Sequence, residues 1–206
     1  KTVKSNIDKL KEYTYYILSG TETDPIGSGT GVAIDEHYIA TNCHVLHDSD
    51  KNRFTNTIQV WNLLDPKNKH GRVKLYKEGL SKDLDICILK TKTQLKYVKK
   101  KIKFSKLEQT DFVRALGNPL QIMGHTADGN INAFETWTKD RKGYKLKTEL
   151  KLIIHDAAIG QGSSGGPLFD IAGNLIGINS MILEEGTSGG FGFAISADHI
   201  NDVLKN

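Results

Sequence analysis

The sequence of 206 residues contains no uncharged apolar run of the roughly 18–20 residues that a membrane-crossing helix requires, so we expect no membrane span. Only two residues are cysteine, and they form no CxxC pair, which excludes a dense disulfide framework and the usual zinc and redox motifs. No repeat with a period of about 20–50 residues occurs, which argues against solenoids and propellers. These absences leave a globular chain of one large domain or two small ones.

Charge gives little indication of a partner. The net charge is +4, and charged residues make up 25% of the chain. A nucleic-acid-binding protein usually carries a denser basic stripe with interleaved aromatic residues. The lysines that gather between residues 96 and 106 are interpreted as a solvated face. We therefore expect no nucleic-acid partner.

The two cysteines, Cys43 and Cys87, are either two buried thiols or one disulfide bridge. We interpret them as two small buried hydrophobic residues, since unpaired cysteine is commonly buried. The chain begins at Lys1, which fits a processed protein, and a removed signal peptide is consistent with that start. The expected location is therefore periplasmic or secreted.

Short apolar stretches bounded by turn residues recur along the chain and predict an all-β barrel or sandwich. They lie at residues 13–18, 32–34, 38–41, 58–61, 73–76, 86–89, 112–116, 151–154, 175–178 and 191–195. A short helix or arm is predicted over residues 1–13, and a closing helix over 197–204 with Ser196 as its N-cap. If there are two barrels, the charged segment 95–107 would join them.

The segment GQGSSGGPL, residues 160–168, carries the strongest chemical signal. A nucleophilic serine needs its hydroxyl exposed on a tight turn, with backbone N–H groups directed at the oxyanion that forms during attack. Glycines on both sides of Ser164 leave room for that approach. Ser164 is the predicted nucleophile, and the N–H groups of Gly162 and Ser164 are the predicted oxyanion donors.

A serine hydroxyl at neutral pH needs a base, usually a histidine held by a carboxylate. His44 lies in TNCHV, residues 41–45, at the end of an apolar strand. Asp85 opens DICILK, residues 85–90, just before another, and Asp83 is its rival. The chain order His, Asp, Ser is that of chymotrypsin, not that of subtilisin or the α/β-hydrolases.

With these motifs the chain resembles trypsin-like serine proteases, and most of all the HtrA (Deg) branch. The family's histidine, aspartate and serine motifs are similar to the segments just quoted, and the match favours Asp85 over Asp83. Four further segments carry the resemblance, namely GSGTGVAID (27–35), ALGNP (115–119), GINS (177–180) and GFAI (192–195). Together they cover most of residues 27–204.

The resemblance implies one protease domain over residues 1–206, built of two antiparallel six-stranded β-barrels. Residues 1–98 would form the N-terminal barrel, 99–195 the C-terminal barrel and 196–206 a C-terminal helix. It further implies an endopeptidase that needs neither a metal nor an organic cofactor. Ser164 would attack the scissile carbonyl, His44 would transfer the proton, and Asp85 would orient His44, with Ser163 as an additional oxyanion donor.

The resemblance also implies protein or peptide substrates, often unfolded, with a small or medium aliphatic residue before the cut. The specificity pocket would be uncharged, because Ala158 stands where trypsin-like enzymes for Arg and Lys carry an acid. No histidine occurs in residues 177–180, which weakens a glutamate-specific interpretation, and His155 is expected in the core or at the pocket rim. The pocket-lining residues would be Ala158, Ile159, Ile178, Asn179 and Ser180.

The chain departs from the family pattern in three respects. It ends soon after Ile195, so we expect that the PDZ domain common in the family is either absent or was cut away. The N-terminal arm has no clear match, which leaves a homotrimer as a weak expectation. Residues 121–150, which include His125 to Thr148, would hold the activation loops, but they match the family's sequence pattern poorly. Two alternatives therefore stay open, a latent pseudo-protease that binds peptides as a scaffold and a secreted virulence-type protease of narrow specificity.

Overall fold

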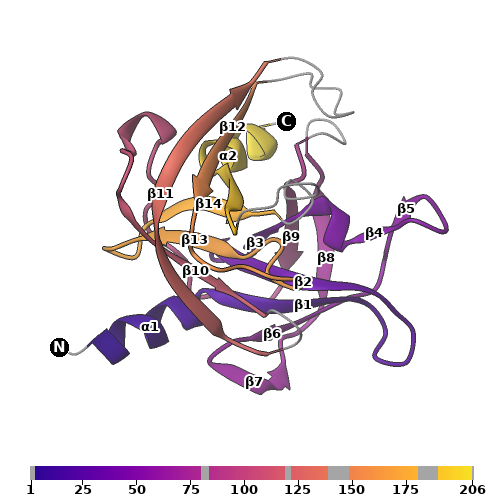
Figure 1. The fold of residues 1–206 in the computed structure, drawn as a ribbon. Coiled ribbons are helices and arrows are strands. Elements are labelled where there is room, and N and C mark those ends of the chain that lie inside the picture. Colours follow the sequence, from indigo (N-terminus) through magenta and orange to yellow (C-terminus); the bar gives the residue numbers. More distant parts are fainter. Residues whose placement is uncertain (1–2, 80–83, 119–121, 139–148, 181–189, 206) are drawn as a thin grey trace.

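A computed structural model of the chain describes residues 3–79, 84–118, 122–138, 149–180 and 190–205. Strands dominate this part of the chain, and its two α-helices are α1 (Val3–Glu12) and α2 (Asp198–Lys205) (Figure 1). The all-β class with a closing helix is confirmed. None of the helices in the described ranges has the length and apolar character needed to cross a membrane.

The first barrel is a ring of six antiparallel strands, closed by the pairing of β1 with β6. A seventh strand, β7 (Asp65–Lys69), extends the sheet from β6, and β4 (His47–Asp48) and β5 (Arg53–Phe54) form a separate hairpin. Around the ring the order is β1 (Thr14–Gly20), β2 (Pro25–Asp35), β3 (Tyr38–Thr41), β9 (Cys87–Thr91), β8 (Val73–Lys77) and β6 (Ile58–Asn62).

The second barrel is also a closed ring of six antiparallel strands, and the pairing of β10 with β13 closes it. The prediction of two six-stranded antiparallel barrels is thus confirmed. The strand order is β10 (Phe112–Gly117), β11 (His125–Trp137), β12 (Leu150–His155), β15 (Gly192–Ser196), β14 (Leu175–Asn179) and β13 (Pro167–Asp170).

Strand β11 corrects the prediction of loops over residues 121–150. It is a 13-residue strand that pairs with β10 on one side and β12 on the other. The sequence HTADGNINAFETW is rich in residues that are poor strand formers, so local propensity does not reveal it. Residues 121 and 139–148 of the same prediction lie outside the described part of the chain.

The two barrels share an apolar cluster, which places their junction in the core of the molecule. Residues 29–34 of β2 are all buried, which is typical of a strand covered on both faces. Val32 and Ile34 belong to the same cluster as Phe169 of the second barrel and Ile200 of α2, whereas Ala33 belongs to the cluster of the first barrel. This arrangement sets the end of β2 against the strands of the second barrel.

The segment that joins β9 to β10 is bonded to the second barrel. The chain passes through η2 (Phe104–Lys106) and then enters β10. Ahead of η2, Lys101 forms a parallel bridge to Leu175 of β14.

The two α-helices lie at the two ends of the chain. At the end of β15 the Ser196 hydroxyl accepts a hydrogen bond of 3.3 Å from the N–H of Asp198, the first residue of α2. Helix α1 projects from the barrels in Figure 1, and its residue Leu10 is buried.

Candidate active site

The predicted nucleophile lies on a tight turn between β12 and β13. The N–H of Ser163 donates to the carbonyl oxygen of Gly160 at 2.8 Å, and Gly162 has a φ of +100°. A hydrogen bond from the fourth residue to the first, with positive φ at the third, defines a type II turn and requires glycine there. Ser164, which follows the turn, is 5% exposed.

The turn uses the N–H of Ser163 internally. That group was predicted from the family resemblance as a third oxyanion donor, but its bond to Gly160 directs it back into the turn. The Ser163 hydroxyl is engaged as well, since it accepts the N–H of Gly160 at 3.2 Å. Ser163 therefore stabilises the turn and is left out of the oxyanion donors proposed below.

Gly165 allows the turn to approach the first barrel. Its φ is +82°, and a Cβ atom there would lie 2.2 Å from the carbonyl oxygen of Thr30 and 2.2 Å from the hydroxyl of Thr41. The contact with the backbone carbonyl of Thr30 cannot be relieved without moving β2 of the first barrel. The glycine after Ser164 is thus required by the packing of one barrel on the other.

Strand pairing brings His44 and Asp85 together. β3 and β9 pair with Thr41 opposite Cys87, so the short helix η1 (Cys43–Val45) after β3 faces the residues that precede β9. His44 Nδ1 lies 2.8 Å from Asp85 Oδ2, and the backbone N–H of His44 donates to Asp85 Oδ1 at 3.0 Å. Because a carboxylate only accepts, Nδ1 carries the proton, which leaves Nε2 of the neutral ring as an acceptor.

Two further side chains hold Asp85. The Asn42 amide donates to the backbone carbonyl of Asp85 at 2.8 Å, and the Ser180 hydroxyl donates to Asp85 Oδ2 at 3.1 Å. The carboxylate thus accepts three hydrogen bonds, two of them on Oδ2. Asp83, the rival acid, lies outside the described residues.

A disulfide joins Cys43 to Cys87. The interpretation as two separate buried hydrophobic residues is therefore wrong. Cys43 immediately precedes His44, and Cys87 follows Asp85 by two positions. The bridge links the two segments that carry the histidine and the aspartate.

His44 and Ser164 line the same open cleft, with a volume of about 520 Å³. Its first-barrel wall is mainly apolar and includes Tyr16, Leu18 and Ile26, while Gln161 and Gly162 of the nucleophile turn complete the other side. The cleft lies at the junction of the barrels, where a polypeptide could pass over both side chains.

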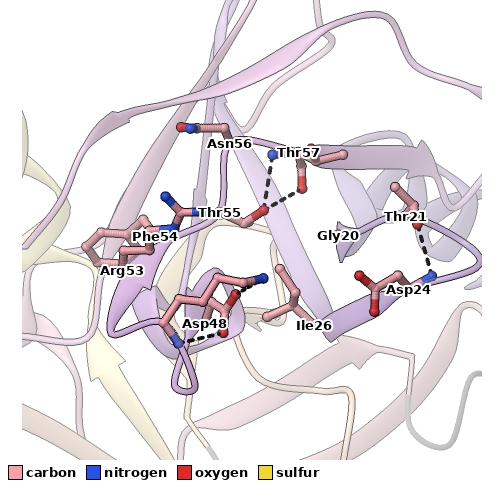
Figure 2. Close-up of a pocket in the computed structure, with 11 residues that line it drawn as sticks. Gly20, Thr21, Asp24, Ile26, Asp48, Arg53, Phe54, Thr55, Asn56 and Thr57 are labelled. Carbon is pink, nitrogen blue, oxygen red and sulfur yellow. Dashed lines mark hydrogen bonds and ion pairs between the residues drawn. The ribbon is translucent and has the colours of Figure 1, made fainter.

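A second, smaller hollow of about 220 Å³ lies beyond Ile26, between the β1–β2 turn and the β4–β5 hairpin. Figure 2 shows that several of its polar groups are bonded to one another. Asp48 bonds to Lys51, which lowers the pKa of that carboxyl, and the Thr55 hydroxyl bonds to Thr57. These internal bonds fix the shape of the hollow next to the cleft.

The five residues predicted to line a specificity pocket do not border the cleft shared by His44 and Ser164. Ala158 is exposed and Ile159 half-buried, between β12 and the nucleophile turn. Ile178, Asn179 and Ser180 are completely buried. The Ser180 hydroxyl points at Asp85, a contact that the sequence prediction missed.

His155 is a core residue. It is completely buried on β12, and its Nε2 lies 3.0 Å from Oδ1 of Asn179 on β14. Burial lowers the pKa of His155 to about 4, although the hydrogen bond to Asn179 partly opposes that shift. The imidazole is therefore neutral at physiological pH.

The known proteins to which the chain is similar are trypsin-like peptidases and HtrA-type proteases. The family model of the trypsin-like peptidase domain matches residues 29–178. A relative described as a probable periplasmic serine endoprotease DegP-like, from Buchnera aphidicola subsp. Baizongia pistaciae, is 37% identical over 183 residues, covering 85% of this chain and 35% of the relative. The human serine protease HTRA4 is 28% identical over 193 residues, covering 91% of this chain and 36% of its own.

The chain spans about a third of the length of these curated relatives. Among solved structures, the HtrA-type protease AlgW, a serine-to-alanine variant with a tripeptide, is 25% identical and aligns with a TM-score of 0.75. That alignment covers 100% of this chain and 63% of the other. The inactive form of Rv3671c from M. tuberculosis, 18% identical, aligns with a TM-score of 0.74 over 97% of this chain and 88% of its own and shares the fold.

Proposed function

The chain belongs to the trypsin-like peptidase family and is of the HtrA type. From that premise we propose that it is a serine endopeptidase that cleaves proteins at the cleft between its barrels. The observation that carries the proposal is the shared cleft. His44, already paired with Asp85 through Nδ1, lines the same 520 Å³ hollow as Ser164. Base and nucleophile thus face one space that is open to a polypeptide.

Ser164 is proposed as the nucleophile and His44 as the general base. As Ser164 Oγ bonds to the scissile carbonyl carbon, His44 accepts the serine proton on Nε2, and it returns that proton to the leaving amine when the C–N bond breaks. The acyl-enzyme that remains is then hydrolysed by water, so one difficult step is split into two easier ones. Asp85 keeps the proton on Nδ1 and stabilises the imidazolium that forms. The two hydrogen bonds from His44 to the carboxylate, at 2.8 and 3.0 Å, support this role.

The N–H groups of Gly162 and Ser164 are proposed to stabilise the oxyanion. In type I and type II turns, ψ at the second position differs by about 150°, so the central amide faces opposite ways. In the turn at residues 160–163 the central amide joins Gln161 to Gly162. Its N–H therefore has the type II orientation, and a type I turn would direct it the opposite way. Backbone donors held in this way need no reorganisation during the reaction.

The residue before the cut is proposed to be small or medium and aliphatic, bound near Ala158 and Ile159. Neither side chain is charged, and no acid stands six residues before Ser164, where an Arg- or Lys-specific pocket would need one. Periplasmic relatives support a periplasmic or secreted location for this chain. Assembly as a homotrimer stays a prediction from family resemblance.

A fluorophosphonate probe followed by peptide mass mapping tests the proposal. The expected result is a covalent label on Ser164 that disappears in Ser164→Ala. A matched control is Ser28→Ala, because Ser28 lines the same cleft but has no proposed role in the chemistry. If folded wild-type protein takes no label on Ser164, the proposal fails and a latent peptide-binding protein becomes the better description.

A further inference from the structure

Thr30, on β2 of the first barrel, is bonded to the nucleophile turn of the second barrel through both its side chain and its backbone. Its hydroxyl donates to the carbonyl oxygen of Gly162 at 2.8 Å, and its N–H donates to the carbonyl oxygen of Ser164 at 2.8 Å. We infer that Thr30 is a positioning residue that keeps the Gly162 N–H directed at the oxyanion. This inference rests on the function proposed above.

The Gly162–Ser163 peptide is held at both of its polar ends. Its carbonyl oxygen accepts the Thr30 hydroxyl, and its N–H donates to Gly160. With this peptide plane fixed, the neighbouring amide between Gln161 and Gly162, whose N–H is the proposed oxyanion donor, cannot turn over by a concerted movement of the two peptides. A φ of +100° at Gly162 places that amide in the type II orientation. Without the Thr30 hydroxyl, one of the two anchors is gone and the alternative turn becomes accessible.

Asn118 fixes the direction in which the Thr30 hydroxyl donates. Its amide Nδ2 donates to Thr30 Oγ1 at 3.0 Å, and its Oδ1 accepts the N–H of Gly124 at 3.0 Å. A flipped amide would set two donors against each other at Gly124, so this orientation is the consistent one. Because a hydroxyl has a single proton and Asn118 already supplies one hydrogen bond, the Thr30 proton goes to Gly162.

The backbone of Thr30 is fixed from the other side. The Thr41 hydroxyl donates to the Thr30 carbonyl at 2.6 Å, and Gly165 packs directly against that carbonyl. Thr30, Thr41 and Asn118 are all at most 1% exposed, so water does not compete for these groups. A hydrogen bond in such surroundings is expensive to leave unmade, because the stranded carbonyl stays desolvated. Through these hydrogen bonds the strands of the first barrel restrict the movement of the turn that carries Ser164.

Valine at position 30 tests the hydroxyl alone, since it keeps the branched shape of threonine and removes the donor. The measurement is the rate of fluorophosphonate labelling of Ser164 against probe concentration, which separates the limiting rate from the probe concentration at half-maximal rate. In Thr30→Val the limiting rate is expected to fall about 10- to 100-fold, with the half-maximal concentration within about threefold of wild type. Thr30→Ser, which restores the donor, should recover most of the rate.

Thr14→Val is the matched control. Thr14 is also completely buried in the first barrel, and its hydroxyl donates to the carbonyl oxygen of Leu10 at 2.9 Å, away from the turn. This variant should lose stability yet label at the wild-type limiting rate. If Thr30→Val labels as fast as wild type, or Thr30→Ser is as slow as Thr30→Val, the positioning role is overturned.

Hydrogen exchange of the Ser163 amide gives a second readout that does not depend on activity. Loss of the Thr30 anchor should speed that exchange about tenfold or more in Thr30→Val and leave it unchanged in Thr14→Val. Unchanged exchange in Thr30→Val overturns the inference, whether or not the wild-type protein is labelled. Absence of a label on the wild-type protein is a different result, which ends the proposed function and not the positioning role of Thr30. If Thr30→Val does not fold, Thr30→Ala, which also removes the donor, replaces it, with the same direction expected in both measurements.

Discussion

The hydroxyl of Ser180 donates a hydrogen bond of 3.1 Å to Oδ2 of Asp85, across 95 residues of sequence. Ser180 follows β14 of the second barrel, while Asp85 precedes β9 of the first. The same carboxylate oxygen lies 2.8 Å from His44 Nδ1. The orientation of the proposed catalytic histidine thus depends on a contact between the two barrels.

Asp85→Asn should lower kcat by about 10³- to 10⁴-fold with an intact fold, because an amide at this position can reverse the ring tautomer and set Nε2 as a donor. Ser180→Ala removes one of three hydrogen bonds to the carboxylate and should cost only about 3- to 30-fold. Fluorophosphonate labelling rates and peptide hydrolysis measure both effects.

Asp48→Asn is the comparison for that charge change, since Asp48 is a buried carboxylate of the first barrel that pairs with Lys51 instead of a histidine. It should lose stability but keep kcat. An Asp85→Asn protein that retains more than a tenth of wild-type kcat would remove Asp85 from the proposed mechanism.

The Cys43–Cys87 disulfide should stabilise the first barrel by about 2–4 kcal/mol, because it closes a loop with a sequence separation of 44 and so restricts the unfolded chain. The double variant Cys43→Ser/Cys87→Ala should lose that much in urea unfolding. Wild-type protein treated with a reductant should show a comparable loss.

The double variant is also the control for the reductant, since it contains no disulfide to reduce and its urea midpoint should not move. A thiol assay that finds two reactive groups in untreated, denatured wild-type protein would show that the bridge is absent in solution.

Burial lowers the pKa of His155 to about 4, whereas an unfolded histidine titrates near 6.5, and this difference makes stability depend on pH. Between those two pH values the unfolded chain binds a proton that the native protein does not. The free energy of unfolding should therefore fall as pH drops from about 6.5 to about 4, by about 3 kcal/mol in total, and this contribution should be constant above and below that window.

Urea unfolding from pH 4 to 8 measures this slope, with His155→Gln as the comparison. The variant should show a shallower decline below pH 6.5, and the difference between the two proteins should not change between pH 7 and 8. Parallel curves throughout would mean that His155 titrates equally in the native and unfolded states. His199, whose pKa burial also lowers, acts in the same direction in both proteins.

Most strands could be predicted because they are short apolar stretches bounded by turn residues, as β3 and β8 illustrate. β11 could not, since Asp128, Gly129 and Asn130 weaken its local strand propensity, and pairing with β10 and β12 stabilises it instead. The disulfide was missed for a related reason. A buried cysteine looks the same in sequence whether or not it is bridged, and only the register that sets Thr41 opposite Cys87 brings the partner Cys43 within reach.

The sequence by itself determined the chemistry that this chain can attempt. Three local patterns carry this information, namely the glycines around Ser164, the motif around His44 and the strand after Asp85. Each can be recognised from neighbouring residues, because a tight turn or a strand end accepts only certain residue types. The tertiary structure decided which groups orient these three residues. Ser180 reaches Asp85 across 95 positions, and Thr30 reaches Gly162 across 132. Such contacts follow from how two closed barrels pack through a shared core, which no local pattern of residues encodes.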